Sequence, residues 1–194
     1  MSTKHIKVLK IGGMKRMKGF RNLFNSCMLN KKGGRGIVMI RVLFVCLGNI
    51  CRSPMAEAVF RDLVSNDKLS AQIEVDSAGT SNWHIGKSPH EGTRKILDTY
   101  EISYDGMKAR QLRREDADLF KYVIVMDDSN KENAAHICST ASDEQIVLLT
   151  DFLQTRTDTF VPDPYFTGDF NETYDLILEG CEQLLYHIKQ EHNL

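Results

Sequence analysis

Cys46 and Arg52 flank the short segment Leu47–Cys51, and together these residue types could carry out chemistry on a phosphate group. A cysteine thiolate is a nucleophile, and the planar guanidinium of an arginine matches two phosphate oxygens at once. The positive groups that bind a phosphate also stabilise a neighbouring thiolate. Gly48 and Asn49 tolerate backbone angles that most residues avoid, as a tight loop requires. The spacing therefore predicts one site that holds both a nucleophile and its substrate.

The residues on either side predict the elements that position this site. The largely apolar run Arg41–Val45 predicts a buried strand that ends at Cys46. Ser53 and Pro54 predict a helix start, with Ser53 as N-cap and Pro54 in the first helical position. Because backbone N–H groups at a helix start lack intrahelical acceptors, we expect them to bind the phosphate. The expected phosphate-binding residues are Leu47, Gly48, Asn49, Ile50, Cys51, Arg52 and Ser53.

Cleavage of a phosphate monoester by a cysteine also needs an acid that protonates the leaving oxygen. Asp163 is the best candidate, because Pro162 and Pro164 on either side hold it in an extended conformation. It follows the last predicted strand, which places it at the same edge of a parallel sheet as Cys46. On its own, an aspartate between prolines more often forms a surface turn.

The string from Cys46 to Pro54, C-x5-R followed by Ser-Pro, resembles the low-molecular-weight protein tyrosine phosphatase family, and the resemblance covers about residues 39–190. It implies hydrolysis of phosphotyrosine and small aryl phosphates through a cysteinyl-phosphate intermediate, with no cofactor and no metal. Members of the family carry their acid in an Asp-Pro-Tyr segment. The resemblance thus implies that Asp163 protonates the leaving tyrosyl oxygen and then serves as base for the water that hydrolyses the intermediate.

The resemblance also implies supporting roles for residues outside this string. Asn49 and Ser53 would brace the loop and hydrogen-bond to the thiolate, and Ser77 would support Asn49. Trp83 and Tyr165 would form the aromatic walls of a cleft deep enough for phosphotyrosine and too deep for phosphoserine. Without the resemblance, these residues are a turn asparagine, a helix cap and ordinary packing or surface side chains.

One segment departs from the family pattern. Many members have a histidine in an H-x-A-R stretch, whereas this chain has Met107-Lys108-Ala109-Arg110. The departure leaves open how Asn49 is braced. The stretch from Met126 to Asn130 also matches the family, and there we expect Asp127 or Asp128 to be structural.

Helices alternate with strands along most of the chain, which predicts an α/β fold. The expected architecture is an open four-stranded parallel sheet with helices on both faces, a three-layer α/β/α arrangement of the low-molecular-weight phosphotyrosine phosphatase type. Ligands of such sheets bind beyond the carboxyl ends of the strands. The predicted helices are 54–66, 90–100, a turn at 113–120, 128–137 and 170–190, with Asp128 or Ser129 as the cap of the helix 128–137. The later strands are 73–77, 122–126 and 146–149.

The charge distribution divides the 194 residues in two. Residues 1–38 carry ten of the 25 Lys and Arg residues and none of the 26 Asp and Glu residues. They show no helical or strand period, so we expect a basic, disordered N-terminal extension followed by one phosphatase domain at 39–194. An extension upstream of the native start is favoured over an arm that binds nucleic acid or anionic lipid.

Composition limits the compartment and the partners. No apolar stretch is long enough to span a membrane, and no signal-peptide core is present, so we expect a cytoplasmic protein. The five cysteines have irregular spacings, as expected of reduced thiols. The expected partners are phosphotyrosine proteins or small aryl phosphates, with no nucleic acid and no membrane; the oligomeric state and the physiological substrate are not predicted.

Three alternative functions share or replace this scaffold. An arsenate reductase needs two further cysteines near the nucleophile, and Cys138 and Cys181 are widely separated in the sequence. Protein-arginine phosphatases of the family tend to have threonine where this chain has Ile50, which favours phosphotyrosine. A non-catalytic phosphotyrosine-binding or redox-sensing module would not need Asp163.

Cys51 lies five residues after the predicted nucleophile and suggests redox regulation. A reactive thiolate is the form that peroxide oxidises to a sulfenic acid, and Cys51 could then close a disulfide with Cys46. The alternative is that Cys51 is a small buried packing residue.

Overall fold

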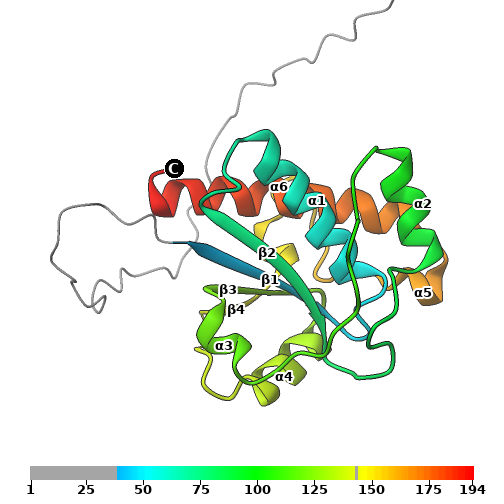
Figure 1. Ribbon diagram of the computed structural model, residues 1–194, viewed down its shortest axis with the longest axis horizontal. Coiled ribbons are helices and arrows are strands. Elements are labelled where there is room, and N and C mark those ends of the chain that lie inside the picture. Colours follow the sequence, from blue (N-terminus) through cyan, green and yellow to red (C-terminus); the bar gives the residue numbers. More distant parts are fainter. Residues whose placement is uncertain (1–38, 143) are drawn as a thin grey trace, which may run out of the picture. The chain divides into compact units, whose positions relative to one another are not determined.

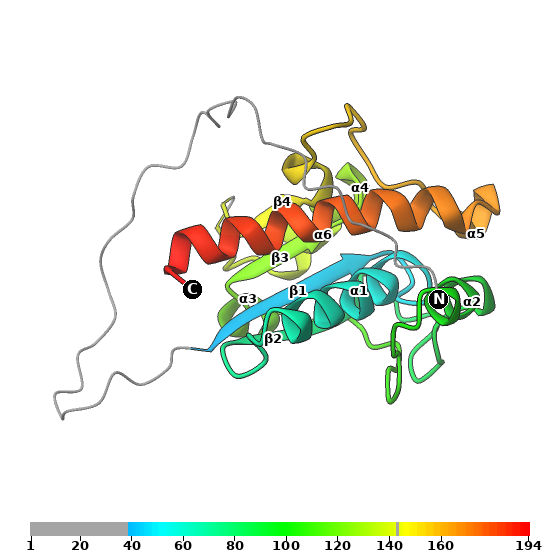
Figure 2. The same cartoon turned by 90° about the horizontal axis from the view of Figure 1, so that it is seen from above.

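The computed structural model describes residues 39–142 and 144–194, and Figures 1 and 2 show it from two directions. The extension predicted at residues 1–38 lies outside the described residues. No helix among the described residues is long and apolar enough to cross a membrane. In chain order, the elements are β1 (Ile40–Cys46), α1 (Arg52–Asn66), β2 (Ile73–Gly79), α2 (Glu91–Thr99), α3 (Asp116–Leu119), β3 (Tyr122–Val125), α4 (Asp128–Ile137), β4 (Ile146–Leu148), the 3₁₀ helix η1 (Leu149–Phe152), α5 (Pro164–Thr167) and α6 (Phe170–His192).

The four strands form one parallel sheet in the order β2-β1-β3-β4. This confirms the predicted α/β fold with helices on both faces: Figure 1 shows α1 and α6 on one side of the sheet and α3 and α4 on the other. Because β1 lies inside the sheet, both of its faces are buried, and its side chains alternate between two hydrophobic clusters. Val42 and Phe44 pack toward α1 and α6, whereas Leu43 and Val45 pack toward α3 and α4.

This layering carries the predicted nucleophile to the carboxyl edge of the sheet. Cys46 is the last residue of β1 and pairs with Gly79, the last residue of β2. Figure 2 shows α2 and α5 at the end of the molecule toward which β1 points. The segments that follow the strands therefore meet around Cys46.

The start of α1 differs from the prediction. The helix begins at Arg52, with Cys51 in the N-cap position and no side-chain cap, so Ser53 is not the N-cap and Pro54 is not in the first helical position. The Ser53 hydroxyl instead contacts Asn49 and Cys46. Pro54 remains in the first turn, where a missing N–H costs no intrahelical bond.

Other boundaries shift by one to three residues, and two short helices were not predicted. Helix α4 is capped by Asp127, which accepts from Asn130 N–H at 2.7 Å, and not by Asp128 or Ser129. The 3₁₀ helix η1 and the four-residue α5 lack the apolar periodicity that identifies longer helices.

Candidate active site

Cys46 is 3% exposed and lies at the base of a loop whose polar groups contact its sulfur. The Asn49 backbone N–H donates to Cys46 Sγ at 3.3 Å, and Ser53 Oγ lies 3.0 Å from the same sulfur. Hydrogen bonds to a sulfur favour its ionised form. Two polar groups of the loop thus converge on the sulfur.

The loop needs Asn49 and Gly48 for different reasons. Asn49 adopts a left-handed conformation with φ of 53°, which asparagine tolerates better than most residues. Gly48 does not have a positive φ; a Cβ at this position would lie 3.0 Å from the His84 ring. A Cβ on Gly79 would likewise lie 3.0 Å from Leu47 O. Space, and not backbone freedom, explains both glycines.

The loop carbonyl groups are bonded outward to neighbouring elements. Thr80 N–H donates to Cys46 O at 2.9 Å and Ser81 N–H to Leu47 O at 2.9 Å. From the start of α2, His90 N–H donates to Ile50 O at 2.7 Å. Carbonyls turned away from the sulfur leave the N–H side of the peptide units facing inward, which suits an anion.

The first turn of α1 adds to this positive field. Met55 N–H donates to Cys51 O at 3.2 Å, the bond that begins the helical ladder, so the preceding N–H groups face the loop. Thr93 Oγ1 also donates to Cys51 O, at 3.3 Å. The expected anion site therefore has both of its parts, loop amides and a helix N-terminus.

The Asn49 side chain braces the loop at three points. Its Nδ2 donates to Ser53 Oγ at 2.9 Å and to Ser77 Oγ at 2.8 Å, and its Oδ1 accepts from Arg110 N–H at 2.9 Å. The contact with Ser77 agrees with the role that the sequence resemblance implied. Sequence reasoning missed Arg110, because a backbone donor leaves no trace in residue type.

Although the family histidine is absent, the hydrogen bonds that support Asn49 through Ser77 are complete. Met107, which stands at its place, is buried in the core beside α1. Glu57 of α1 instead accepts from the Ser77 hydroxyl at 2.6 Å. The sequence offered a signal for Glu57, an acidic residue one helical turn after Ser53, but such a residue is usually exposed.

Arg52 is buried and holds two carboxylates. Its Nη1 lies 2.6 Å from Asp127 Oδ2, and its Nη2 lies 2.7 Å from Asp163 Oδ2. Burial acts to lower the pKa of Arg52, but the negative charges of Cys46, Asp163 and Asp127 outweigh it and raise the pKa above its ordinary value. The guanidinium therefore remains a permanent positive charge beside the sulfur.

Asp163 is held extended between its prolines, as expected, with φ of −86° and ψ of 108°. Its Oδ1 accepts from Tyr165 N–H at 3.1 Å and caps α5. The segment is fixed to the sheet by Val161 N–H, which donates to Met126 O at 2.8 Å. Asp163 thus faces the loop of Cys46 across the Arg52 guanidinium.

These side chains surround a cleft of about 220 Å³. Trp83 and Tyr165 line it, as expected, and are 67% and 58% exposed. Two further residues of the rim, His84 and Phe166, were not predicted, because nothing in their sequence context sets them apart. The full lining is Cys46, Leu47, Gly48, Ile50, Cys51, Trp83, His84, Asp163, Tyr165 and Phe166.

The remaining described cysteines lie elsewhere in the core. Cys138 packs on the side of α3 and α4, and Cys181 packs on the side of α1 and α6, so the sheet separates them. Among residues 39–142 and 144–194, no group of three or more His, Cys, Asp or Glu side chains could hold a metal ion.

Comparison with known proteins places this geometry in a family. The family described as low molecular weight phosphotyrosine protein phosphatase matches residues 41–194. The low molecular weight protein-tyrosine-phosphatase YfkJ of Bacillus subtilis (strain 168) is 51% identical over 156 residues, which cover 80% of this chain and 100% of YfkJ. The corresponding phosphatase PtpA of Staphylococcus aureus (strain MRSA252) is 42% identical, covering 80% of this chain and 98% of PtpA.

Solved structures show the same similarity. The crystal structure of YfkJ superposes with a TM-score of 0.78 over 81% of this chain and 99% of that one. The crystal structure of DARP, a Drosophila arginine phosphatase, is 35% identical, with a TM-score of 0.71 over 77% of this chain and 98% of that one.

Proposed function

This chain belongs to the low-molecular-weight phosphotyrosine protein phosphatase family, and from that premise we propose that residues 39–194 are a phosphatase domain that hydrolyses phosphotyrosine and small aryl phosphates. One observation carries the assignment of its site: Cys46, Arg52 and Asp163 converge at one cleft at the carboxyl edge of the sheet.

In the first step, the Cys46 thiolate attacks phosphorus and forms a sulfur–phosphorus bond. The bond from phosphorus to the tyrosyl oxygen breaks, and Asp163 gives its proton to that oxygen. Arg52 supports this proposal, because it holds Asp163 at 2.7 Å and its guanidinium can bind two phosphoryl oxygens with one fork. The loop amides and the N-terminus of α1 bind the same oxygens.

In the second step, water attacks phosphorus while Asp163, now a carboxylate, accepts its proton. The sulfur–phosphorus bond breaks, which restores the thiolate and releases inorganic phosphate. The contact of Ser53 Oγ with Cys46 Sγ supports this step, because a hydrogen bond to the departing sulfur stabilises it as an anion.

The similarity to DARP makes phosphoarginine the second candidate substrate. Two features of the cleft favour phosphotyrosine: the apolar Ile50 in the loop, and the aromatic rim of Trp83 and Tyr165 against which a phenyl ring can pack. The test compares kcat/KM for matched phosphotyrosine, phosphoserine and phosphoarginine peptides. Phosphotyrosine should be fastest; a faster reaction with phosphoarginine would replace this assignment.

Redox regulation and a cytoplasmic location are further parts of the proposal. Both Cys46 and Cys51 line the cleft. Burial, with the charges of Asp163 and Cys46, raises the pKa of the Cys51 thiol to about 12. Peroxide converts Cys46 to a sulfenic acid. Cys51 can then attack that sulfur and lose its proton to the departing hydroxide, so that the disulfide forms and water leaves, in a cytoplasm whose thiols later reduce it.

The redox proposal is tested with peroxide. Treated wild type should regain activity with dithiothreitol, and mass spectrometry should find a disulfide between Cys46 and Cys51. Cys51→Ser should be driven to an unrecoverable form. Equal recovery of both proteins would leave Cys51 as a packing residue.

A further inference from the structure

Glu57 is a buried carboxyl group that the proposed mechanism does not use. It lies on α1, one turn after Ser53, and is 7% exposed. One of its oxygens, Oε2, accepts from the Ser77 hydroxyl at 2.6 Å. The other, Oε1, lies 3.1 Å from Arg61 Nη1. Since a carboxyl group is almost never buried without a reason, these two contacts need an explanation.

The Ser77 contact fixes one of two chains of hydrogen bonds that begin at the Asn49 amide. A carboxylate can only accept, so the Ser77 hydroxyl must donate to Glu57, and its oxygen is left to accept from Asn49 Nδ2. The other hydrogen of Nδ2 goes to Ser53 Oγ. Because Asn49 Oδ1 is occupied by the Arg110 N–H, the amide has one orientation that satisfies every partner.

The other chain ends at the nucleophile. Ser53 Oγ already accepts from Asn49, so its own proton is free to point elsewhere. Two acceptors are within reach, Cys46 Sγ at 3.0 Å and Ala78 O at 3.3 Å. A proton directed at the sulfur stabilises the thiolate. Glu57 anchors the Ser77 side of the Asn49 amide and the sulfur lies at its Ser53 side, so the anchored amide leaves the Ser53 proton available to the sulfur.

We propose that Glu57 is a positioning residue, whose carboxylate, held by Arg61, accepts from Ser77 and so anchors the Asn49 amide that donates to Ser53 beside Cys46. The proposal rests on the role proposed above for Cys46. It also explains how the protein supports Asn49 with Met107 in place of the family histidine.

The groups around Glu57 act on its charge in opposite directions. Burial raises the pKa of Glu57 above its ordinary value and Asp76 on β2 raises it further, whereas the Ser77 hydroxyl and Arg61 oppose the rise. Arg110, in the segment after α2, pairs with Asp76 at 2.8 Å and so moderates its effect. A protonated Glu57 could donate as well as accept, and the Ser77 hydroxyl would then lose its fixed direction.

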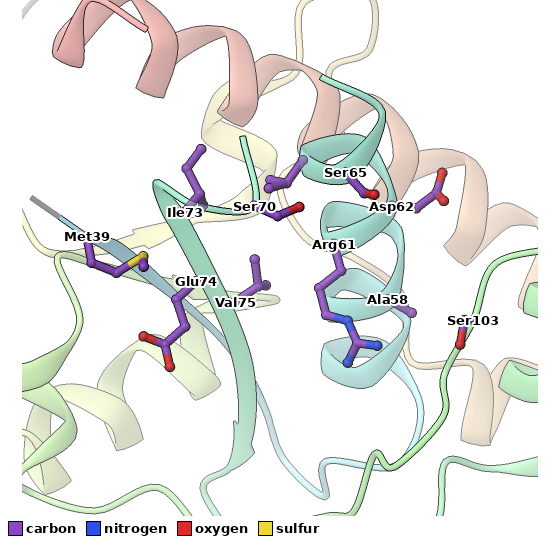
Figure 3. A pocket seen from close by; sticks show the side chains of 11 residues that line it. Met39, Ala58, Arg61, Asp62, Ser65, Ser70, Ile73, Glu74, Val75 and Ser103 are labelled. Carbon is purple, nitrogen blue, oxygen red and sulfur yellow. The ribbon is translucent and has the colours of Figure 1, made fainter. Parts of the chain in front are cut away.

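Arg61 connects these hydrogen bonds to a second cavity. The cavity has a volume of about 510 Å³ and lies between α1 and β2; Figure 3 shows Arg61 on the wall formed by α1, with Glu74 and Val75 of β2 opposite. Its lining shares no residue with the catalytic cleft. Arg61 therefore reaches Glu57 from a cavity that is separate from the catalytic cleft.

The test is Glu57→Gln, with the pH dependence of Cys46 alkylation by iodoacetamide as readout, assigned by peptide mapping. Beside Arg61, a glutamine turns its carbonyl toward the guanidinium and its NH₂ toward Ser77. The Ser77 hydroxyl then loses its acceptor and its oxygen must accept from two donors, which weakens the anchor of Asn49. We expect the alkylation midpoint to rise by about one pH unit. Glu74→Gln, which removes a carboxylate from the same cavity, is the matched control and should leave the midpoint unchanged.

A double variant tests the direction itself. With Arg61→Met added to Glu57→Gln, the glutamine carbonyl is free to accept from Ser77, and part of the shift should be recovered. An unchanged midpoint in Glu57→Gln overturns the proposal, and so does a double variant without recovery. If Glu57→Gln does not fold, Arg61→Met alone decides, since removal of the cation should also raise the midpoint.

The readout separates this proposal from the proposed function. A wild-type Cys46 that reacts like an ordinary thiol would contradict its role as nucleophile. A reactive wild-type Cys46 that is unaffected by Glu57→Gln would contradict only the role of Glu57. The pH profile of kcat/KM for an aryl phosphate should shift in parallel with the alkylation midpoint.

Discussion

The phosphate loop and the rim of the cleft contribute to one site but are built differently. In the loop, Asn49, Arg52 and Ser53 are all buried, and each has polar partners on other elements. On the rim, Trp83, Tyr165 and Phe166 are all more than half exposed and present aromatic surface to solvent. The loop is held by directional bonds, whereas the rim is held mainly by the backbone that carries it.

This difference assigns bond cleavage to the loop and substrate recognition to the rim. Bond cleavage needs groups fixed to within fractions of an ångström, and buried hydrogen bonds provide that precision. Recognition of the group that carries the phosphate needs contact area, which exposed rings provide at low conformational cost. Changes in the loop should therefore affect turnover, and changes on the rim should affect substrate affinity.

Cys46→Ser should have the largest effect. A serine hydroxyl at this position is a far weaker nucleophile, so turnover should fall below detection while phosphate still binds to the loop. Single-turnover kinetics and phosphate titration measure the two properties separately. Substantial activity in Cys46→Ser would end the covalent mechanism.

Arg52→Lys tests whether the loop needs a fork or only a charge. A lysine ammonium cannot bind two phosphoryl oxygens in one plane or hold Asp127 and Asp163 together, so kcat should fall by about a hundredfold or more. Steady-state kinetics with an aryl phosphate measure the loss. A variant with near wild-type kcat would show that charge alone suffices.

Asp163→Asn lies between the two regions, because Asp163 borders the rim and contacts Arg52. Without its proton, phosphates with poor leaving groups should slow by about 10²- to 10⁴-fold, and those with good leaving groups should slow much less. A series of substituted phenyl phosphates measures the dependence. Equal losses across the series would make Asp163 structural.

Trp83→Ala and Tyr165→Ala should have the smallest effects. They test whether the rim contributes to substrate affinity and not to turnover. Each removes one exposed ring, so KM for a phosphotyrosine peptide should rise by about tenfold while kcat changes little. The thermal midpoint should stay close to that of wild type, since both side chains are largely exposed. A fall in kcat equal to that of Arg52→Lys would remove the distinction between the two regions.

The sequence predicted the elements whose signals are local. Strand β1 reads as a continuous apolar run, and the alternation of strands and helices predicted the parallel sheet that the structure confirms. The cap of α4 was misplaced by one residue, because Asp127, Asp128 and Ser129 all have side chains that can cap a helix. Ser53 was read as a cap for the same reason, although its hydroxyl is used by Asn49 and Cys46.

The convergence of Cys46, Arg52 and Asp163 followed from the fold, since segments that leave parallel strands meet at one edge. The partners of Arg52 could not be predicted in the same way. Asp127 and Asp163 follow different strands, and their distances from the guanidinium depend on backbone positions that no local pattern encodes. The buried position of Glu57 depends on tertiary packing and escaped prediction for the same reason.

The two carboxylates on Arg52 predict that substrate binding exchanges one anion for another. Each terminal nitrogen of the guanidinium already holds a carboxylate, whereas its buried Nε has no hydrogen-bond partner among the described residues. A phosphate that binds the fork formed by Nε and a terminal nitrogen would therefore take the place of one carboxylate. We expect the displaced carboxylate to compete for Arg52 with every oxyanion, the product included, and so to favour the release of inorganic phosphate.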